Sequence, residues 1–225
     1  MRYFFMTDIH GMFELLVNAL KRINEMCPDE DVTIFFGGDY VDRGPKSKVL
    51  DLLMAGPTMG WPGRTRMGDV WIIMKGNHED MMVAALDGAR LTDYSLWMTN
   101  GGAETMKSFP SGGVDQCYLD WMRELPTSAE SDFHFFCHAG VMPDVPLEDQ
   151  DPHVMMWIRD RFLNWIDPHP KYIVHGHTPN NAAEILDNRC NLDSAAFWTG
   201  VLSVAEFDLT KPGKPINVFT VDKDR

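Results

Sequence analysis

The chain has 225 residues, of which 44% are hydrophobic, and its formal net charge at pH 7 is −13. This length and composition are typical of a globular protein with an extensive core, and we expect one domain over residues 1–225. The acidic balance argues against a nucleic-acid-binding surface, because such a surface needs clustered Lys and Arg.

Five short apolar runs are predicted to be β-strands, and each of them is followed by a cluster of polar residues. In chain order they occupy residues 2–6, 32–36, 70–74, 133–136 and 172–174. Residues 199–209 and 215–222 are also strand-like, and no helix is predicted between them. We therefore expect antiparallel strands in the C-terminal part of the chain.

Helical patterns lie between the strands. Four helices are predicted from the spacing of apolar residues, at 12–26, 46–54, 79–86 and 157–165. Residues 56–68 are rich in Gly and Pro, and residues 143–152 in acids and prolines, so both are predicted to be loops. The alternation of strands and helices indicates an α/β fold.

The residues at the five strand ends are of types that bind divalent metal ions. They are Asp8, His10, Asp39, Asn77, His138 and His177. In α/β sheets, ligands bind outside the carboxyl ends of the strands. The preference of polar residues for turns would explain one polar strand end, but it explains five poorly. Carboxylate, imidazole and amide oxygen suit manganese, iron or zinc, while the lack of thiolates disfavours structural zinc. We interpret Asp39 as a bridging ligand, because its flanking glycines let backbone approach closely.

Three neighbouring residues have the chemistry of phosphoryl transfer. His78 directly follows Asn77, so we predict that it protonates a leaving group without being a ligand. Asp42 is predicted to hold the tautomer of this imidazole, and Arg43 to bind the non-bridging phosphate oxygens. A pair of metal ions acidifies bound water and clamps both oxygens of an in-line displacement. The set therefore favours a metal-dependent phosphoesterase.

Each residue has an ordinary structural explanation when it is taken alone. Asn77 would be a turn residue, and His138 a hydrogen-bonded core histidine. Asp42 and Arg43 would be a surface ion pair of little energetic value. The functional interpretation depends on finding all the required residue types together, each at a strand end.

The motifs around these residues resemble those of a known enzyme family. They are Asp8-x-His10-Gly11, Gly38-Asp39-Tyr40-Val41-Asp42-Arg43-Gly44, Gly76-Asn77-His78-Glu79, His138-Ala139-Gly140 and Gly176-His177-Thr178-Pro179. Together they resemble the calcineurin-like metallophosphoesterases and, more narrowly, the compact bacterial and phage members of the phosphoprotein phosphatase family. The motifs span residues 8–179, and residues 191–204 resemble the family's closing segment.

The resemblance implies two packed, mixed β-sheets flanked by α-helices, with a dinuclear metal site at the strand ends. It implies that a first ion is held by Asp8, His10 and Asp39, and a second by Asp39, Asn77, His138 and His177. His78 with Asp42 would be the acid dyad. The substrate phosphate would be bound by Arg43, Asn77 and the arginine of a W-x-R segment, Arg159. Residues 96–102 resemble a W-x-x-N-G-G stretch, which we interpret as a structural loop near the site.

The activity implied by the resemblance is hydrolysis of phosphoserine and phosphothreonine in proteins, by direct attack of a metal-bridging hydroxide. The implied cofactor is a pair of divalent ions, manganese first, with iron, zinc, nickel or cobalt as alternatives. We expect a monomer whose partner is a phosphoprotein or phosphopeptide, with neither nucleic acid nor membrane involved. Cysteines without paired spacing and the lack of a long apolar run lead us to expect a cytoplasmic protein.

Three other functions share these motifs. A sister bacterial branch hydrolyses symmetrical diadenosine tetraphosphate, which requires a nucleoside pocket where Trp97 or Trp198 stacks on a base. A phosphodiesterase is disfavoured because Pro179 replaces a further histidine ligand, and His175 fits the strand better. A metal-binding module without turnover is disfavoured because His78 and its neighbours are intact. We expect specificity to depend on loops at 56–68, 87–113 and 143–152.

Overall fold

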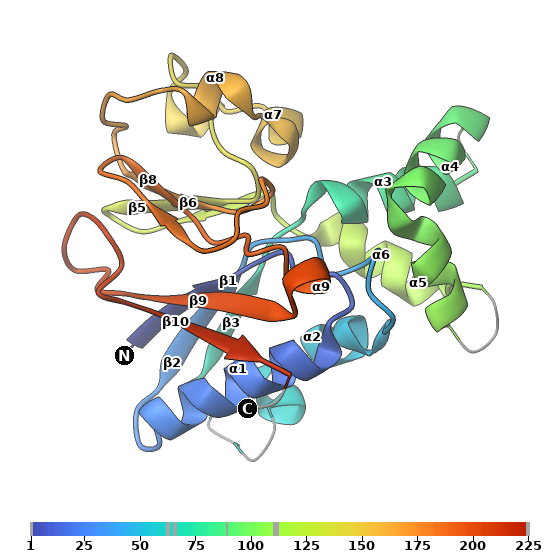
Figure 1. The fold of residues 1–225 in the computed structure, drawn as a ribbon, viewed down its shortest axis with the longest axis horizontal. Coiled ribbons are helices and arrows are strands. Elements are labelled where there is room, and N and C mark those ends of the chain that lie inside the picture. Colours follow the sequence, from blue (N-terminus) through green and yellow to red (C-terminus); the bar gives the residue numbers. More distant parts are fainter. Residues whose placement is uncertain (1, 62–63, 65–66, 89, 110–112, 224–225) are drawn as a thin grey trace.

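The computed structural model describes residues 2–61, 64, 67–88, 90–109 and 113–223, and its core is a pair of five-stranded sheets (Figure 1). The first sheet has the strand order β10 (Asn217–Asp222), β9 (Val201–Phe207), β1 (Arg2–Met6), β2 (Val32–Phe36) and β3 (Val70–Ile73). The second has the order β4 (Ser128–Glu130), β5 (His134–Cys137), β6 (Tyr172–His175), β8 (Arg189–Asn191) and β7 (Glu184–Ile185).

Both sheets are mixed, as expected. In the first, β1, β2 and β3 are parallel, whereas β9 and β10 run antiparallel, which confirms the expected C-terminal arrangement. In the second, β5, β6 and β8 are parallel and the edge strands β4 and β7 are antiparallel. The three strands β4, β7 and β8 were not predicted, because two or three residues are too few to display a period.

The two sheets pack face to face through aromatic side chains. Phe136 of β5 stacks on Phe35 of β2, with ring centroids 4.1 Å apart, and on Phe5 of β1 at 5.8 Å. Phe5 and Phe136 are fully buried. Because one face of each central strand meets the other sheet and the opposite face meets helices, these strands read as continuous apolar runs.

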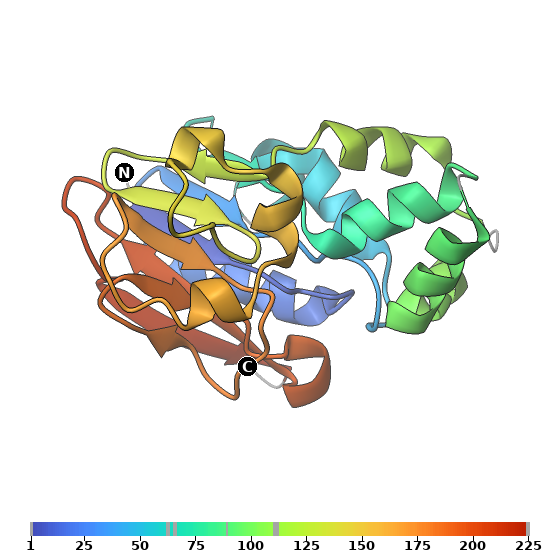
Figure 2. The same cartoon turned by 90° about the horizontal axis from the view of Figure 1, so that it is seen from above.

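Helices cover the outer faces of both sheets (Figures 1 and 2). Against the first sheet lie α1 (Phe13–Met26) and α2 (Lys48–Gly60), and against the second lie α7 (Pro152–Trp157) and α8 (Asp160–Leu163). A separate group contains α3 (Asn77–Leu86), α4 (Leu91–Trp97), the π-helical turn η1 (Met98–Gly102), α5 (Ala103–Ser108) and α6 (Gln116–Glu124). The short α9 (Ala196–Thr199) precedes β9.

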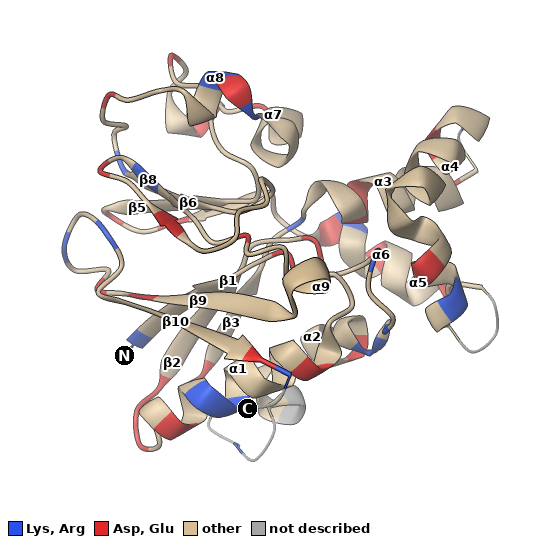
Figure 3. Ribbon diagram, in the orientation of Figure 1, with Lys and Arg blue, Asp and Glu red and all other residues tan. Residues whose placement is uncertain are grey.

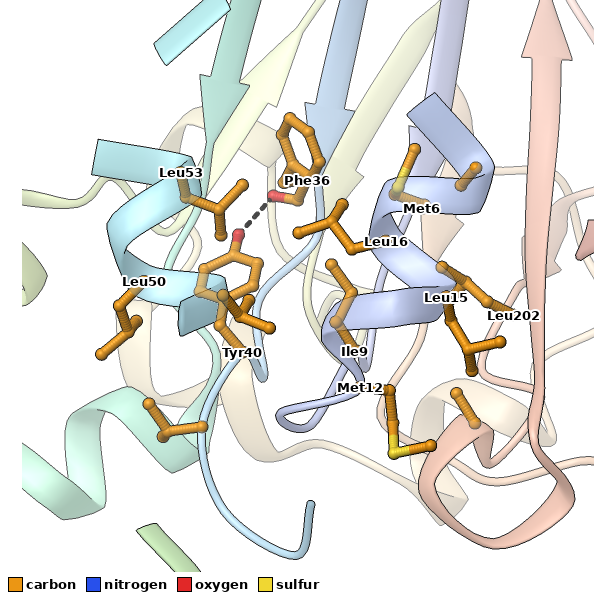
Figure 4. Close-up of a cluster of buried hydrophobic side chains, with 14 of the residues drawn as sticks. Met6, Ile9, Met12, Leu15, Leu16, Phe36, Tyr40, Leu50, Leu53 and Leu202 are labelled. Atoms are coloured by element: carbon orange, nitrogen blue, oxygen red, sulfur yellow. Dashed lines mark hydrogen bonds between the residues drawn. The ribbon is translucent and has the colours of Figure 1, made fainter. Parts of the chain in front are cut away.

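The core beneath α1 positions the loops that follow β1 and β2 (Figure 4). Leu16 of α1 and Ile9 pack in the same buried cluster as Tyr40. The Tyr40 hydroxyl donates a hydrogen bond to the Phe36 carbonyl at 2.9 Å (Figure 4) and lies 2.7 Å from the Met74 carbonyl oxygen. The segment after β2 is therefore held in place by the packing of the Tyr40 ring and by the polar contacts of its hydroxyl group.

Three of the four predicted helices differ from the structure by two or more residues, whereas the helix predicted at 12–26 begins only one residue later, at Phe13. α2 continues past residue 54 to Gly60 through a kink at Gly56, where φ is 72°, so the predicted loop starts later. α3 begins at Asn77, two residues early, which places Asn77 and His78 in its first turn. The helix predicted at 157–165 is instead α7 and α8, separated at Arg159. Part of the predicted loop, at 62–63 and 65–66, lies outside the described residues.

Two predicted loops were wrong in part. Residues 91–108 of the segment 87–113 are helical, as α4, η1 and α5. Within 143–152, Asp151 caps α7 by accepting a hydrogen bond from the His153 backbone amide at 2.7 Å, and Pro152 begins the helix. An Asp-Pro pair is a helix-start signal that the acid-rich composition concealed.

Acidic residues outnumber basic ones, 33 to 20, and they are distributed over many elements (Figure 3). Among the described residues, no helix is both long and apolar enough to cross a membrane.

Candidate metal centre and active site

The strand pairing brings the carboxyl ends of five strands together. Met6, Phe36 and Ile73, the last residues of β1, β2 and β3, are in register, so the loops that follow start side by side. In the second sheet β5 and β6 are in parallel register. His138, just after β5, contacts the Gly37 carbonyl after β2 through its Nδ1 at 2.8 Å. The site is therefore built where the two sheets meet.

Four predicted ligands form a compact cluster, which we call the second ligand group: Asp39, Asn77, His138 and His177. The His138 Nε2 atom lies 2.9 Å from Asn77 Oδ1, 3.2 Å from His177 Nδ1 and 3.3 Å from Asp39 Oδ1. His177 Nδ1 is 3.1 Å from Asn77 Oδ1. All four side chains are buried. The potential ligand atoms thus converge on one point.

This spacing fits a divalent cation. Ligand atoms about 2.1 Å from an ion in octahedral geometry lie about 3 Å from one another, which matches the distances in the group. Burial would lower the pKa of His138, but the adjacent Asp39 carboxylate outweighs this effect and raises it to about 10. Positive charge is therefore stabilised at this position, and a bound divalent ion would supply it.

His10 and Asp39 define a first ligand group on the opposite side of the Asp39 carboxylate. His10 Nε2 lies 3.5 Å from Asp39 Oδ2, whereas His138 faces Oδ1. His10 Nδ1 donates to the Val41 carbonyl at 2.7 Å, which leaves Nε2 with its lone pair facing the site. Burial lowers the pKa of His10 to about 3, so the ring is neutral, as a metal ligand must be.

Asp8 lies at the edge of the first group rather than within it. Its Oδ2 accepts hydrogen bonds from the Thr7 hydroxyl at 2.8 Å and the His177 backbone amide at 3.1 Å. The side chain is buried, and burial together with the nearby Asp193 carboxylate raises the pKa of Asp8 well above its usual range. The tight triads of ligand atoms contain Asp39 with His10 and His78, or with His138 and His177, but not Asp8.

The two residues of the predicted acid dyad lie within hydrogen-bond distance of each other. His78 Nδ1 lies 2.7 Å from Asp42 Oδ2, and His78 Nε2 faces the site, 3.8 Å from Asp39 Oδ2. Trp97 Nε1 donates to Asp42 at 2.9 Å and the Thr105 hydroxyl donates at 2.6 Å. These donors fix the carboxylate orientation, and the carboxylate in turn fixes the imidazole.

The two predicted phosphate-binding arginines differ in exposure. Arg43 is half-buried, with Nη1 3.1 Å from His10 Nε2 and its guanidinium 5.0 Å from the Phe197 ring centroid. Arg159 is exposed, and its Nη2 donates to the His177 carbonyl at 3.2 Å, so it is tied to the second ligand group through the backbone. His175 is buried beside the Arg189 guanidinium and belongs to neither ligand group.

Backbone strain is concentrated in the site. Seven described non-glycine residues have a positive φ, and six of them are predicted site residues: Asp8, His10, Asp39, Asp42, Arg43 and His177. Such conformations cost of order 1–3 kcal/mol each and persist only where the surrounding structure enforces them. Two glycines show how close the packing is. An added Cβ would lie 2.2 Å from Asp39 Oδ1 at Gly76 and 2.1 Å from Asp8 Oδ2 at Gly176.

Glu79 enforces one of these turns and was not recognised from the sequence. Its fully buried carboxylate accepts hydrogen bonds from the backbone amides of Asp39 at 2.8 Å, Tyr40 at 2.7 Å and Gly76 at 2.9 Å. The Val41 amide lies 3.3 Å away. The available signal was the position of Glu79 three residues after Gly76, where a glutamate closes a capping box at a helix start.

Asp193 is a second buried carboxylate that the motifs did not single out. Its Oδ1 accepts from the Ala195 amide at 2.8 Å, and its backbone carbonyl accepts from the Asn180 amide at 3.0 Å. Burial and the Asp39 charge raise the pKa of Asp193. The carboxylates of Asp8, Asp39 and Asp193 therefore interact electrostatically with one another. Buried negative charges this close together are costly, and a bound cation would stabilise them.

The comparison with known families agrees with this geometry. The family model described as calcineurin-like phosphoesterase matches residues 1–218. The chain is a calcineurin-like phosphoesterase. Members of this family use a dinuclear centre of divalent metals, and the ligand groups around Asp39 are suited to hold one.

The relatives of this phosphoesterase carry two different names. It is 26% identical over 208 residues to serine/threonine-protein phosphatase 1 of Salmonella typhimurium, with 88% of each chain covered. It is 29% identical over 142 residues to a symmetrical bis(5'-nucleosyl)-tetraphosphatase of Vibrio parahaemolyticus, covering 63% of this chain and 45% of that one. A structure named as a putative diadenosine tetraphosphatase superposes with a TM-score of 0.67 at 19% identity, covering 98% of this chain and 93% of that one. This last likeness concerns the fold.

Proposed function

We propose that this phosphoesterase hydrolyses phosphoserine and phosphothreonine in proteins. The observation that carries the proposal is the arrangement around Asp39. One carboxylate faces His10 through Oδ2 and His138 through Oδ1, and the His78–Asp42 dyad lies beside it. The relatives named serine/threonine-protein phosphatase support the substrate class, because they match 87–88% of this chain at 26–27% identity.

The side chains of the site have separate roles in the proposed phosphoryl displacement. Arg43, Arg159 and the Asn77 amide bind the phosphate oxygens and orient the phosphorus for in-line attack. When bound, two divalent ions, for which we propose manganese, supply an acidified water as the nucleophile and neutralise phosphate charge.

His78 completes the reaction as a general acid. Its Nε2 carries the proton that is transferred to the leaving alkoxide oxygen of serine or threonine. Asp42 accepts the hydrogen bond from Nδ1 at 2.7 Å and stabilises the protonated imidazole. Because an alkoxide is a poor leaving group, we expect this proton transfer to matter more for phosphothreonine than for an activated aryl phosphate.

Symmetrical dinucleoside tetraphosphate hydrolysis is the second candidate. The identity to the Vibrio parahaemolyticus tetraphosphatase, over 63% of this chain, favours it. Trp97 is not free to stack on a base, because it is fully buried and its Nε1 donates to Asp42. Trp198, which is 83% exposed, is the remaining one of the two tryptophans considered for this role.

The test is a comparison of initial rates with manganese on a phosphothreonine peptide and on diadenosine tetraphosphate, with His78→Asn as the control for each substrate. Preferred peptide turnover that is lost in His78→Asn supports the proposal. Preferred dinucleotide turnover transfers support to the second candidate. If neither substrate is turned over, the proposed function is wrong.

A further inference from the structure

A hollow with a volume of about 370 Å³ opens beside the ligand groups, and the proposed chemistry does not use it. One wall is formed by residues 179–181, which follow the proposed ligand His177. The other wall is formed by residues from 195–199, which include α9. The two walls come from the segments after β6 and before β9, so the hollow borders the site where both sheets contribute.

Ring contacts connect this hollow to the proposed acid. The Phe197 ring, which lines the hollow, makes an edge contact with the His10 ring at a centroid distance of 5.4 Å. The His10 ring in turn contacts the His78 ring at 4.7 Å. The Arg43 guanidinium lies over Phe197 at 5.0 Å. The hollow is therefore connected to the proposed acid, His78, and to the proposed phosphate-binding residue, Arg43, through the Phe197 ring.

Trp198 presents a large aromatic surface to this hollow. It is 83% exposed, although tryptophan is highly buried on average in folded proteins. Trp97, in contrast, is fully buried with its Nε1 bound to Asp42. An exposed aromatic face is a surface on which a planar ring stacks, and such stacking tolerates different ring types.

Hydrogen bonds hold both walls of the hollow in place. The Asp193 carbonyl accepts from the Asn180 amide at 3.0 Å, and the Asp193 carboxylate accepts from the Ala195 amide at 2.8 Å. The buried Asn191 side chain donates to the Thr178 carbonyl at 2.6 Å. A hollow fixed in this way is pre-organised, so little conformational entropy is lost when a ligand binds.

We infer that Phe197 and Trp198 form a subsite for a planar ring of the substrate, next to the proposed phosphate-binding residue Arg43. Asn180 and Asn181 line the opposite wall and offer amide groups to the edge of that ring. The ring is either an aromatic side chain near the phosphorylated residue or a nucleobase, since both have the same stacking chemistry. The inference rests on the proposed phosphoesterase activity and adds the substrate feature that the site selects.

The experiment measures kcat/KM with manganese for three substrates. Two are phosphothreonine peptides that differ only in having Phe or Gly beside the phosphothreonine, and the third is diadenosine tetraphosphate. Each is compared across wild type, Trp198→Leu and Trp198→Phe. The matched control is Ile166→Ala, because Ile166 is 88% exposed and does not line the hollow.

We expect Trp198→Leu to lower kcat/KM for a ring-bearing substrate about five- to tenfold relative to the Gly peptide, mainly through KM. Trp198→Phe keeps a ring and retains most of the preference, and Ile166→Ala leaves it unchanged. A fall only for the Phe peptide identifies an aromatic side chain, and a fall only for the dinucleotide identifies a nucleobase. Either result supports the subsite.

Two outcomes would overturn the subsite. One is an unchanged preference in Trp198→Leu, and the other is an equal fall in Trp198→Phe and Trp198→Leu. These outcomes leave the proposed function standing, because wild-type turnover is measured in the same assay. Absence of turnover for all three substrates would instead contradict the proposed function itself.

Discussion

Replacing Glu79 with glutamine tests whether a buried carboxylate shapes the metal centre. In the native protein Oε1 accepts from the Tyr40 amide at 2.7 Å, and Oε2 accepts from the amides of Asp39 at 2.8 Å and Gly76 at 2.9 Å. A glutamine side chain has one oxygen and one NH2 group, so one side of it must face backbone N–H donors with a donor. The variant changes no volume, which separates this effect from packing.

The magnitude follows from the number of amides that lose a partner. A buried polar group left unsatisfied costs roughly 1–3 kcal/mol, so one or two orphaned amides cost about 1–6 kcal/mol. The positive φ of Asp39, 58°, is held in part by these bonds. We therefore also expect manganese binding to weaken about 10- to 100-fold, as is typical when a group that orients a metal ligand is altered.

The assay is urea unfolding of the metal-free protein, followed by calorimetric titration with manganese. Glu25→Gln is the matched control, since the Glu25 side chain is 65% exposed and lies on α1. We expect the control to stay within about 0.5 kcal/mol of wild type. A Glu79→Gln protein with control-like stability and unchanged manganese affinity would refute the positioning role of this carboxylate.

Three further perturbations follow from the same geometry. His78→Asn is expected to lower kcat on a phosphothreonine peptide by about 10²–10⁴, with a smaller loss on p-nitrophenyl phosphate, whose leaving group needs little protonation; equal losses would contradict the acid role. Asp39→Asn removes a charge shared by both ligand groups, so bound manganese per chain, measured by mass spectrometry, is expected to fall from two to one or none. For His134, burial lowers the pKa, so protonation favours the unfolded chain and stability is lost as pH falls below about 6.5. The stability difference between wild type and His134→Asn, from urea unfolding, is therefore expected to be larger at pH 7.5 than at pH 5.5, and a difference independent of pH would contradict this.

The clustering of ligand residues was predictable because two separate signals agreed. Each apolar run ended in a residue with metal-binding chemistry, and parallel pairing brings the carboxyl ends of strands together. Asp39, Asn77 and His138 meet in the structure for this reason, although they are far apart in the sequence. The helix bounds were less predictable, because Gly56 and Arg159 interrupt helical patterns through their backbone conformation rather than through hydrophobic periodicity.

The supporting contacts could not be predicted, because they depend on how separate elements pack. Trp97 and Thr105 bind Asp42 from α4 and α5, across sequence separations of 55 and 63 residues. No local pattern distinguishes a tryptophan that packs in the core from one that also binds a carboxylate. The same limit applies to Trp198, whose exposure depends on the short α9 turn that precedes β9.

The metal centre combines strain with supports that do not depend on the metal. Glu79 binds the turn at Asp39 and Tyr40, and Thr105 donates to Asp42 as well as accepting from its backbone amide at 2.8 Å. These hydrogen bonds are made between protein groups, so they hold the positive-φ turns in place whether or not metal ions are bound. Little free energy is then lost in ordering the ligands when the metal binds. We therefore expect a pre-formed site rather than one that folds around the metal.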